Sequence, residues 1–196
     1  MVFTLSSEQL EELADKVMNK IEEKLSARDV YVDKQISELK SENEDLGAKT
    51  DDLEQRSRLE NLRIFGITEK PAENTNRLVI DVATKVGVTL SMTSISRSHR
   101  VGPKRPDATR PRAIIVKFVS YADRQRLFTA KKLLKGSNIT LKEDLTAVRQ
   151  KILKKASDHF KDYPVWSQNG VIIIKLNDGF HRIQTLKKLE ELIDSQ

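Results

Sequence analysis

The segment from Arg97 to Arg112, "RSHRVGPKRPDATRPR", concentrates positive charge. Guanidinium and ammonium groups pair with phosphate, and each phosphate that a protein neutralises on a nucleic acid releases counterions. Loops of this length inside a compact domain usually have a function. The segment therefore predicts a surface that binds the phosphate backbone of a nucleic acid. Its cations are Arg97, Arg100, Lys104, Arg105, Arg110 and Arg112, set among three prolines and one aspartate.

The residues that could support catalysis form no recognisable motif. His99, His159 and His181 lie far apart, and the sequence contains no HExxH motif, nucleophile elbow or P-loop. The chain has no cysteine, which excludes a disulfide framework and cysteine-containing zinc sites. Glu143 and Asp144 fit the acidic first turn of a helix better than an acid/base pair. We therefore expect no enzymatic activity, no metal site and no cofactor.

Acidic and basic residues are separated along the chain. Residues 1–58 contain 9 Lys and Arg against 15 Asp and Glu, a net charge of −6. Residues 59–196 contain 26 Lys and Arg against 14 Asp and Glu, a net charge of +12. An acidic segment followed by a strongly basic one indicates different roles, and the basic part should attract a polyanion.

The acidic segment has the pattern of a coiled coil. Ser6 and Gln9 form a predicted capping box, and a helix over residues 7–59 would be roughly 80 Å long at 1.5 Å per residue. A heptad seam this narrow predicts self-association, and dimer and trimer both remain open. The alternative is a helix that packs on its own C-terminal domain. The seam consists of Leu25, Val32, Leu39, Leu46 and Leu53, with Ile36, Asn43 and Thr50 three positions before the last three of these.

The middle of the chain predicts the element order βαββαβ. The pattern gives strands at about residues 62–67, 94–101, 111–119 and 138–142, and helices at about 78–86 and 121–134. This order over about 80 residues is the ferredoxin-like arrangement that RNA-recognition domains use.

Alternation along these strands places Arg63 and Lys117 on the open face of the predicted sheet. The first and third strands are central and adjacent in this topology, so the two cations are expected to lie close together. Neighbouring cations destabilise an empty sheet, and a phosphate or a base between them would remove the repulsion. The strand "RAIIVKFV" lacks the usual stacking aromatics, so we expect low sequence specificity. The alternative is two solvated cations on an open sheet.

The C-terminal part predicts a basic helix, a hairpin and a final amphipathic helix. In "EDLTAVRQKILKKASDHF" the apolar residues follow one face, which leaves Arg149, Lys154 and Lys155 among the exposed cations. The hairpin is predicted to turn at Asn169–Gly170. Trp166, which is the only tryptophan, suits a core position and a base-stacking position equally well.

These segments together resemble the first-open-reading-frame protein of LINE-type (non-LTR) retrotransposons. After the coiled coil come "NLRIFGI", "ISRSHRVG" with its basic loop, "PRAIIVKF", "LKGSNITLKEDLT" and "NGVIIIK", in the same order as in that family. The resemblance spans roughly residues 35–180. It implies a protein that forms a trimer through the coiled coil and coats the RNA of the element as a nucleic-acid chaperone. The segment "RLENLR" departs from the trimer-favouring motif of vertebrate relatives, which ends in Glu.

The resemblance also implies which residues contact nucleic acid. Arg63, Lys117 and the loop cations match backbone-contacting positions. Lys131, Lys132 and Lys135 fall in a basic segment before the fourth strand, and Arg149, Lys154 and Lys155 correspond to a basic helix of the C-terminal domain. The implied partners are single-stranded RNA and DNA, and the implied location is cytoplasmic ribonucleoprotein particles and the nucleus. The competing function is a coiled-coil scaffold that binds a protein partner.

The sequence therefore predicts an α+β protein in three parts. These are a coiled-coil helix (1–59), a ferredoxin-like RNA-recognition domain (60–142) and a small α/β C-terminal domain that binds nucleic acid (143–196). The longest wholly apolar runs have four residues, as in "VIII" at 171–174, so no membrane partner is expected.

Overall fold

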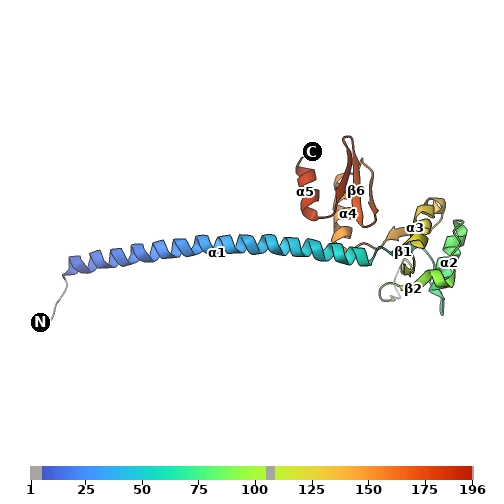
Figure 1. Cartoon of the computed structure of the whole chain (residues 1–196), viewed down its shortest axis with the longest axis horizontal. Helices are drawn as coiled ribbons and strands as arrows, with labels where there is room; N and C mark the ends of the chain where they lie inside the picture. The colour runs from blue at the N-terminus through green and yellow to red at the C-terminus, as the bar shows by residue number, and fades with distance from the viewer. Residues whose placement is uncertain (1–5, 105–108, 196) are drawn as a thin grey trace. The chain divides into compact units, whose positions relative to one another are not determined.

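A computed structural model describes residues 6–104 and 109–195 of the chain. The chain forms two compact units, residues 1–49 and 50–196. Helix α1 (Ser7–Ser57) continues from the first unit into the second (Figure 1). It begins with the predicted capping box, because the Ser6 hydroxyl accepts from the Gln9 N–H at 3.3 Å and the Gln9 side chain accepts from the Ser6 N–H at 3.0 Å.

The predicted heptad seam of α1 lies on the surface of the single chain. Leu39 is 62% exposed and Leu53 is 69% exposed, and the other seam residues are also exposed. Burying apolar side chains contributes about 1.5–3 kcal/mol each, so this stripe would gain from a partner helix. Self-association itself stays a prediction.

The second unit contains an antiparallel four-stranded sheet with the strand order β2-β3-β1-β4. The chain passes through it in the order β1, α2, β2, β3, α3, β4. Short 3-10 turns precede β2 and follow α3, at Met92–Ser94 and at η2 (Lys131–Leu134). The elements are β1 (Asn61–Phe65), α2 (Thr75–Lys85), β2 (Ile95–Arg100), β3 (Ile114–Phe118), α3 (Tyr121–Ala130) and β4 (Thr140–Glu143).

Period-two alternation fixes which face of this sheet is covered. Leu62 and Ile64 of β1 and Val116 of β3 are fully buried, and they pack in one core with Val79 of α2 and Leu127 of α3. The residues between them along each strand must then point to the opposite, open face. Both helices therefore lie on one side of the sheet and leave the other side uncovered by them.

A three-stranded antiparallel sheet with the order β5-β6-β7 follows along the chain. Ile172 and Ile174 of β6 form a second core with Ile152 and Leu189 from the helices that flank the sheet. The β5–β6 hairpin turns at Asn169 and Gly170, whose φ values of 52° and 78° match the predicted turn. The elements are α4 (Ala147–His159), β5 (Val165–Gln168), β6 (Val171–Leu176), β7 (Gly179–Ile183) and α5 (Leu186–Asp194).

The segment from Glu143 to Thr146, between β4 and α4, is buried and polar except for Leu145, which corrects the predicted helix start. Glu143 is the last residue of β4 and α4 begins at Ala147, with Thr146 as its N-cap. The Glu143 carboxylate accepts from Arg124 at 2.6 Å and from the backbone N–H of Asn169 at 2.7 Å. Glu143 therefore links α3 to the β5–β6 turn, whereas the sequence predicted it in the first turn of a helix.

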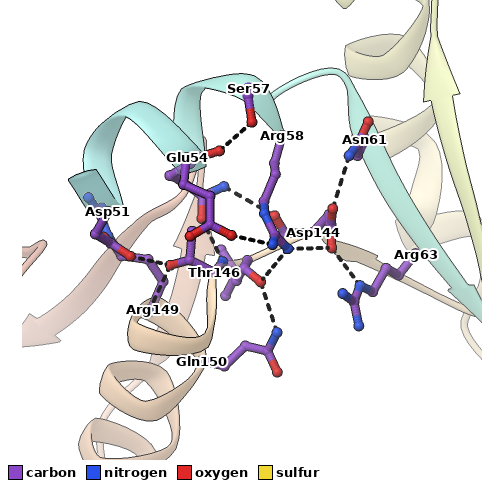
Figure 2. Close-up of polar contacts among 12 residues, drawn as sticks. Asp51, Glu54, Ser57, Arg58, Asn61, Arg63, Asp144, Thr146, Arg149 and Gln150 are labelled. Carbon is purple, nitrogen blue, oxygen red and sulfur yellow. Dashed lines mark hydrogen bonds and ion pairs between the residues drawn. The ribbon is translucent and has the colours of Figure 1, made fainter. Parts of the chain in front are cut away.

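Asp144 is the second buried acid of this linker, and Figure 2 shows its partners. Its carboxylate accepts from Arg63 Nε at 2.6 Å and from Asn61 Nδ2 at 3.0 Å, both on β1. Arg58, just after α1, also approaches it at 3.4 Å. Buried charges are retained only when they are paired and hydrogen-bonded, and this carboxylate meets both conditions.

The last turns of α1 hold the start of α4 through Asp51. The Asp51 carboxylate accepts from Arg149 Nε at 2.6 Å and from the Thr146 hydroxyl at 2.5 Å (Figure 2). The Gln55 side chain accepts from the Thr146 backbone N–H at 3.0 Å. The expectation that Arg149 is an exposed cation was wrong, because Arg149 is 2% exposed. A buried charge needs a partner, and Asp51 is that partner.

Candidate nucleic-acid interface

Strand pairing sets which cations are neighbours on the open face of the four-stranded sheet. Lys117 of β3 lies opposite Arg97 of β2 and opposite Asn61 of β1. Arg63 lies opposite Ile115 of β3 and opposite Lys142 of β4. Lys117 is therefore a diagonal neighbour of Arg63 on this face, and the directly paired cations are Arg97 with Lys117 and Arg63 with Lys142.

Arg63 and Lys117 both have an acidic partner, which the sequence did not reveal. Arg63 is bound to Asp144 at 2.6 Å, and Lys117 lies 3.6 Å from Glu60. The Arg63–Asp144 pair relieves part of the repulsion between Arg63 and Lys142. An empty sheet therefore tolerates these cations without a bound phosphate, so their position alone does not favour a ligand over the alternative of cations on an open sheet.

Two arginines of the basic segment hold its ends in place. Arg100 donates to Glu73 at 2.6 Å and to the backbone carbonyls of Ile67 at 2.8 Å and Arg112 at 2.6 Å. Arg112 binds Glu69 and donates to the Gly102 carbonyl at 2.8 Å. We therefore assign these two arginines a structural role.

Of the four remaining cations of this segment, the structure describes three. Arg97, Lys104 and Arg110 are exposed, and none makes an ion pair with a residue that the structure describes. They stay candidates for phosphate contacts. Arg105 lies outside the described residues.

The ion pairs of the basic segment should weaken in acid. Hydrogen bonding to Arg100 lowers the pKa of Glu73 below its usual 4.5, and Arg112 does the same for Glu69. A carboxylate with a depressed folded-state pKa stabilises the fold above its unfolded pKa, and this stabilisation is lost as the pH falls through the folded value. We expect Glu73→Gln to lower the melting temperature at neutral pH, with the difference from wild type shrinking below pH 4.5. A difference that stays constant down to about pH 3 would contradict this assignment.

A cleft of about 1220 Å³ lies beside β1 and β4. The open face of these strands lines one side, and η2, α4 and β5 line the rest. Its acidic lining residue, Glu143, is already bound to Arg124. The cations that line the cleft are Arg63, Lys131, Lys132, Lys135, Lys142, Lys151 and Lys154.

The six lysines of this cleft make no ion pair with any described residue. Burial lowers the pKa of Lys131, whose ammonium lies 3.7 Å from the ring centroid of Phe128. Like charges gathered around a partly enclosed space produce a positive potential that attracts anions. The cleft is therefore suited to a polyanion.

Three aromatic side chains also line the cleft, and two of them, Phe65 and Trp166, belong to the two sheets, whereas Phe128 is buried in the core. Phe65 stands on the open face of β1, and Lys142 lies 5.7 Å from its ring centroid. Trp166 of β5 is half-buried and lies in the second sheet. Aromatic faces beside cations can stack unpaired bases while the lysines contact phosphates.

The structure gathers some of the predicted contact residues in this cleft and separates others from it. Lys155 lies on the same helix as Lys154 but pairs with Glu190 at 2.7 Å and does not line the cleft. Arg97 and Lys117 lie on the other half of the sheet, outside the cleft lining. The predicted residues that do line it are Arg63, Lys131, Lys132, Lys135, Lys154 and Trp166.

Two cleft cations and one aromatic residue of the open sheet face were missing from the predicted contact set. Lys142 and Phe65 could have been found by extending the period-two alternation from Leu141 and from Arg63. Lys151 lies three residues before Lys154 on α4, so helical spacing places both on one face.

Comparison of the chain with known protein families found no matching family model, and comparison with curated proteins found no similar sequence. No helix within residues 6–104 and 109–195 is long and apolar enough to cross a membrane. Within the same part of the chain, no three His, Asp or Glu side chains are grouped so that they could hold a metal ion.

Proposed function

We propose that this protein is a homo-oligomeric single-stranded nucleic-acid-binding protein that holds RNA in the basic cleft. The observation that carries the proposal is the lining of the cleft, where six lysines that have no acidic partner among the described residues lie together with the aromatic side chains of Phe65 and Trp166. Phosphate contacts supply sequence-independent affinity, and stacking accepts every base because every base has a π-face. Binding should therefore depend little on sequence.

The topology of the four-stranded sheet supports the same proposal. Its chain order and its strand order, β2-β3-β1-β4, agree with the ferredoxin-like arrangement of RNA-recognition domains. In such domains the open face of the sheet binds the nucleic acid, and here this face lines the cleft with Arg63, Phe65 and Lys142.

The resemblance to the first-open-reading-frame protein of LINE-type retrotransposons suggests a biological role. We propose that the protein packages the RNA of such an element into a ribonucleoprotein, as a trimer joined by α1, and acts as a nucleic-acid chaperone. Each subunit of the oligomer would contribute one cleft. Several weakly binding clefts together would hold a long RNA tightly, while each single cleft could still release and rebind it. Single-stranded DNA has the same phosphates and unpaired bases, so it should also bind.

The cleft lysines give a direct test against a protein scaffold. We expect Lys142, Lys151 and Lys154 changed together to Ala to reduce the salt dependence of oligonucleotide binding. On single strands log affinity falls with log salt by about 0.7 per phosphate contact, so the slope should become shallower by about 2. The measurement is a fluorescence-anisotropy titration at several salt concentrations.

The matched control changes Lys85, Lys161 and Lys188 to Ala. These lysines are exposed and lie outside the cleft lining, and the net charge changes by the same amount. Equal slopes for the two triple variants would contradict cleft binding. A wild-type protein with no salt-dependent affinity for any single strand would favour the scaffold.

A further inference from the structure

The three-stranded sheet has a second face that the C-terminal core does not use. Ile172 and Ile174 point into that core, so the residues that alternate with them point to the other face. The register places Trp166 and Arg182 on either side of Ile173, and Phe180 beside Lys175. Ile173 is buried but is not part of either core, which agrees with its place in the middle of this face.

Two aromatic rings form the centre of this face. The ring centroids of Trp166 and Phe180 are 6.2 Å apart, and their planes meet at 85°. Phe180 is 65% exposed, which is unusual for a large apolar side chain on a strand. Its ring is therefore free to meet a flat partner from solution.

The three strands place two charged side chains on this face, and both are cations. Lys175 Nζ lies 5.8 Å from the centroid of the Phe180 ring, and Arg182 lies opposite Ile173. Neither makes an ion pair with a described residue. Asp178, in the turn that joins β6 to β7, is bound to His181 at 2.9 Å, and His181 lies opposite Ile174, which belongs to the core face. The face therefore has the charge of a surface for an anionic partner.

Trp166 connects this face to the cleft. It lies on β5, which is an edge strand of the sheet, and it also lines the cleft together with Lys151 and Lys154. A strand of nucleic acid that leaves the cleft at Trp166 can therefore continue along the sheet to Phe180, whose ring lies beside that of Trp166.

We propose that the outer face of β5–β6–β7 is a second base-stacking site for single-stranded nucleic acid leaving the cleft. Bases stack on Trp166 and Phe180, and Lys175 and Arg182 contact the phosphates. This inference rests on the proposed function, and it adds that the binding path is longer than the cleft. Accessible aromatic rings beside cations that have no acidic partner among the described residues suit a polyanion with flat bases better than they suit an apolar protein surface.

Phe180→Ala tests the second site with the full chain. Stacking is worth about 1–3 kcal/mol per base, so we expect the variant to bind an oligonucleotide of about 20 uridines roughly tenfold more weakly. An oligonucleotide of about 5 uridines fits the cleft alone and should bind with unchanged affinity. Phe180→Tyr keeps a stacking ring and should restore binding of the long oligonucleotide. Quenching of Trp166, the only tryptophan, reports the bound bases directly.

A long oligonucleotide without bases distinguishes the contribution of base stacking from that of phosphate contacts. It keeps the phosphates, so wild type and Phe180→Ala should bind it equally. Equal affinity of the two proteins for the long uridine oligonucleotide would overturn the second site and leave the face for a protein partner. An equal loss on the short and the long oligonucleotide would also overturn it, because the change would then act through the cleft. Failure of wild type to bind either one would instead refute the proposed function.

Discussion

Removing residues 1–49 is expected to give a stable monomer, whereas removing residues 1–58 is expected to destabilise the remaining fold by about 3–5 kcal/mol. The first deletion ends at the boundary of the compact unit and leaves Asp51 and Gln55 in place. The second leaves Arg149 buried without its carboxylate partner and Thr146 without the Gln55 acceptor. Breaking a buried ion pair from one side is strongly destabilising, because the remaining charge is not compensated.

The shorter deletion should also reveal the contribution of α1 to binding. It removes all but one heptad of the seam, and a single heptad is too short to hold two helices together. We expect apparent affinity for a long RNA to fall by roughly 10²- to 10⁴-fold, since each cleft then binds alone. Light scattering measures the chain number, and urea denaturation measures the stability of each fragment.

Point variants distinguish the effect of losing the polar contacts of Asp51 from the effect of shortening the chain. In the 50–196 fragment, Asp51→Ala should reproduce most of the instability of the longer deletion, while Leu53→Ala, on the same turn and exposed, should change stability little. A 50–196 fragment that remains oligomeric would contradict the coiled-coil assignment. Equal stability of the two deletions would show that the contacts of Asp51 do not hold α4.

The features that the sequence predicted correctly depend on neighbouring residues. The capping box at Ser6, the alternation in β1 and β3 and the turn at Asn169–Gly170 each follow from residues within a few positions of one another. The α+β class and the long N-terminal helix follow from the same local patterns. Hydrophobic period and turn chemistry therefore gave most of the element order.

The features that the sequence did not predict depend on distant partners. Arg149 meets Asp51 98 positions away, and Arg63 meets Asp144 81 positions away. The sequence does not show whether the partner of a cation is a buried acid or a phosphate. The predicted contact set therefore assigned both arginines to the nucleic acid. Strand register also determines that Arg63 lies beside Lys142. A shift of the strand pairing by one residue would turn the side chains of the strand to the other face of the sheet.

Glu143→Ala should be among the most destabilising single changes in the chain, lowering the free energy of unfolding by about 3–5 kcal/mol. The change leaves the Arg124 guanidinium, which is 1% exposed, without its only carboxylate among the described residues. Arg124 Nε already lacks a hydrogen-bond partner in this part of the chain. The backbone N–H groups of Asn169 and Gly170 lose their acceptor as well, and the one on Gly170 is buried, where an unsatisfied group costs about 1–3 kcal/mol.

The same change should weaken nucleic-acid binding beyond the fraction of protein that unfolds. Glu143 ties the four-stranded sheet to the β5–β6 turn, so its loss frees Trp166 of β5 and the cleft lysines of α4 from Lys142 of β4. Urea denaturation followed by Trp166 fluorescence and by circular dichroism measures the stability, and anisotropy at low temperature measures binding by the folded fraction. Glu190→Ala, which removes an exposed partner of Lys155, should change the stability little, because surface ion pairs are screened by water. Changing Glu143 and Arg124 together to Leu should be less harmful than Glu143→Ala, because no uncompensated charge remains. A Glu143→Ala protein within about 1 kcal/mol of wild type would show that water replaces these contacts, and the junction would then be too weak to position the cleft.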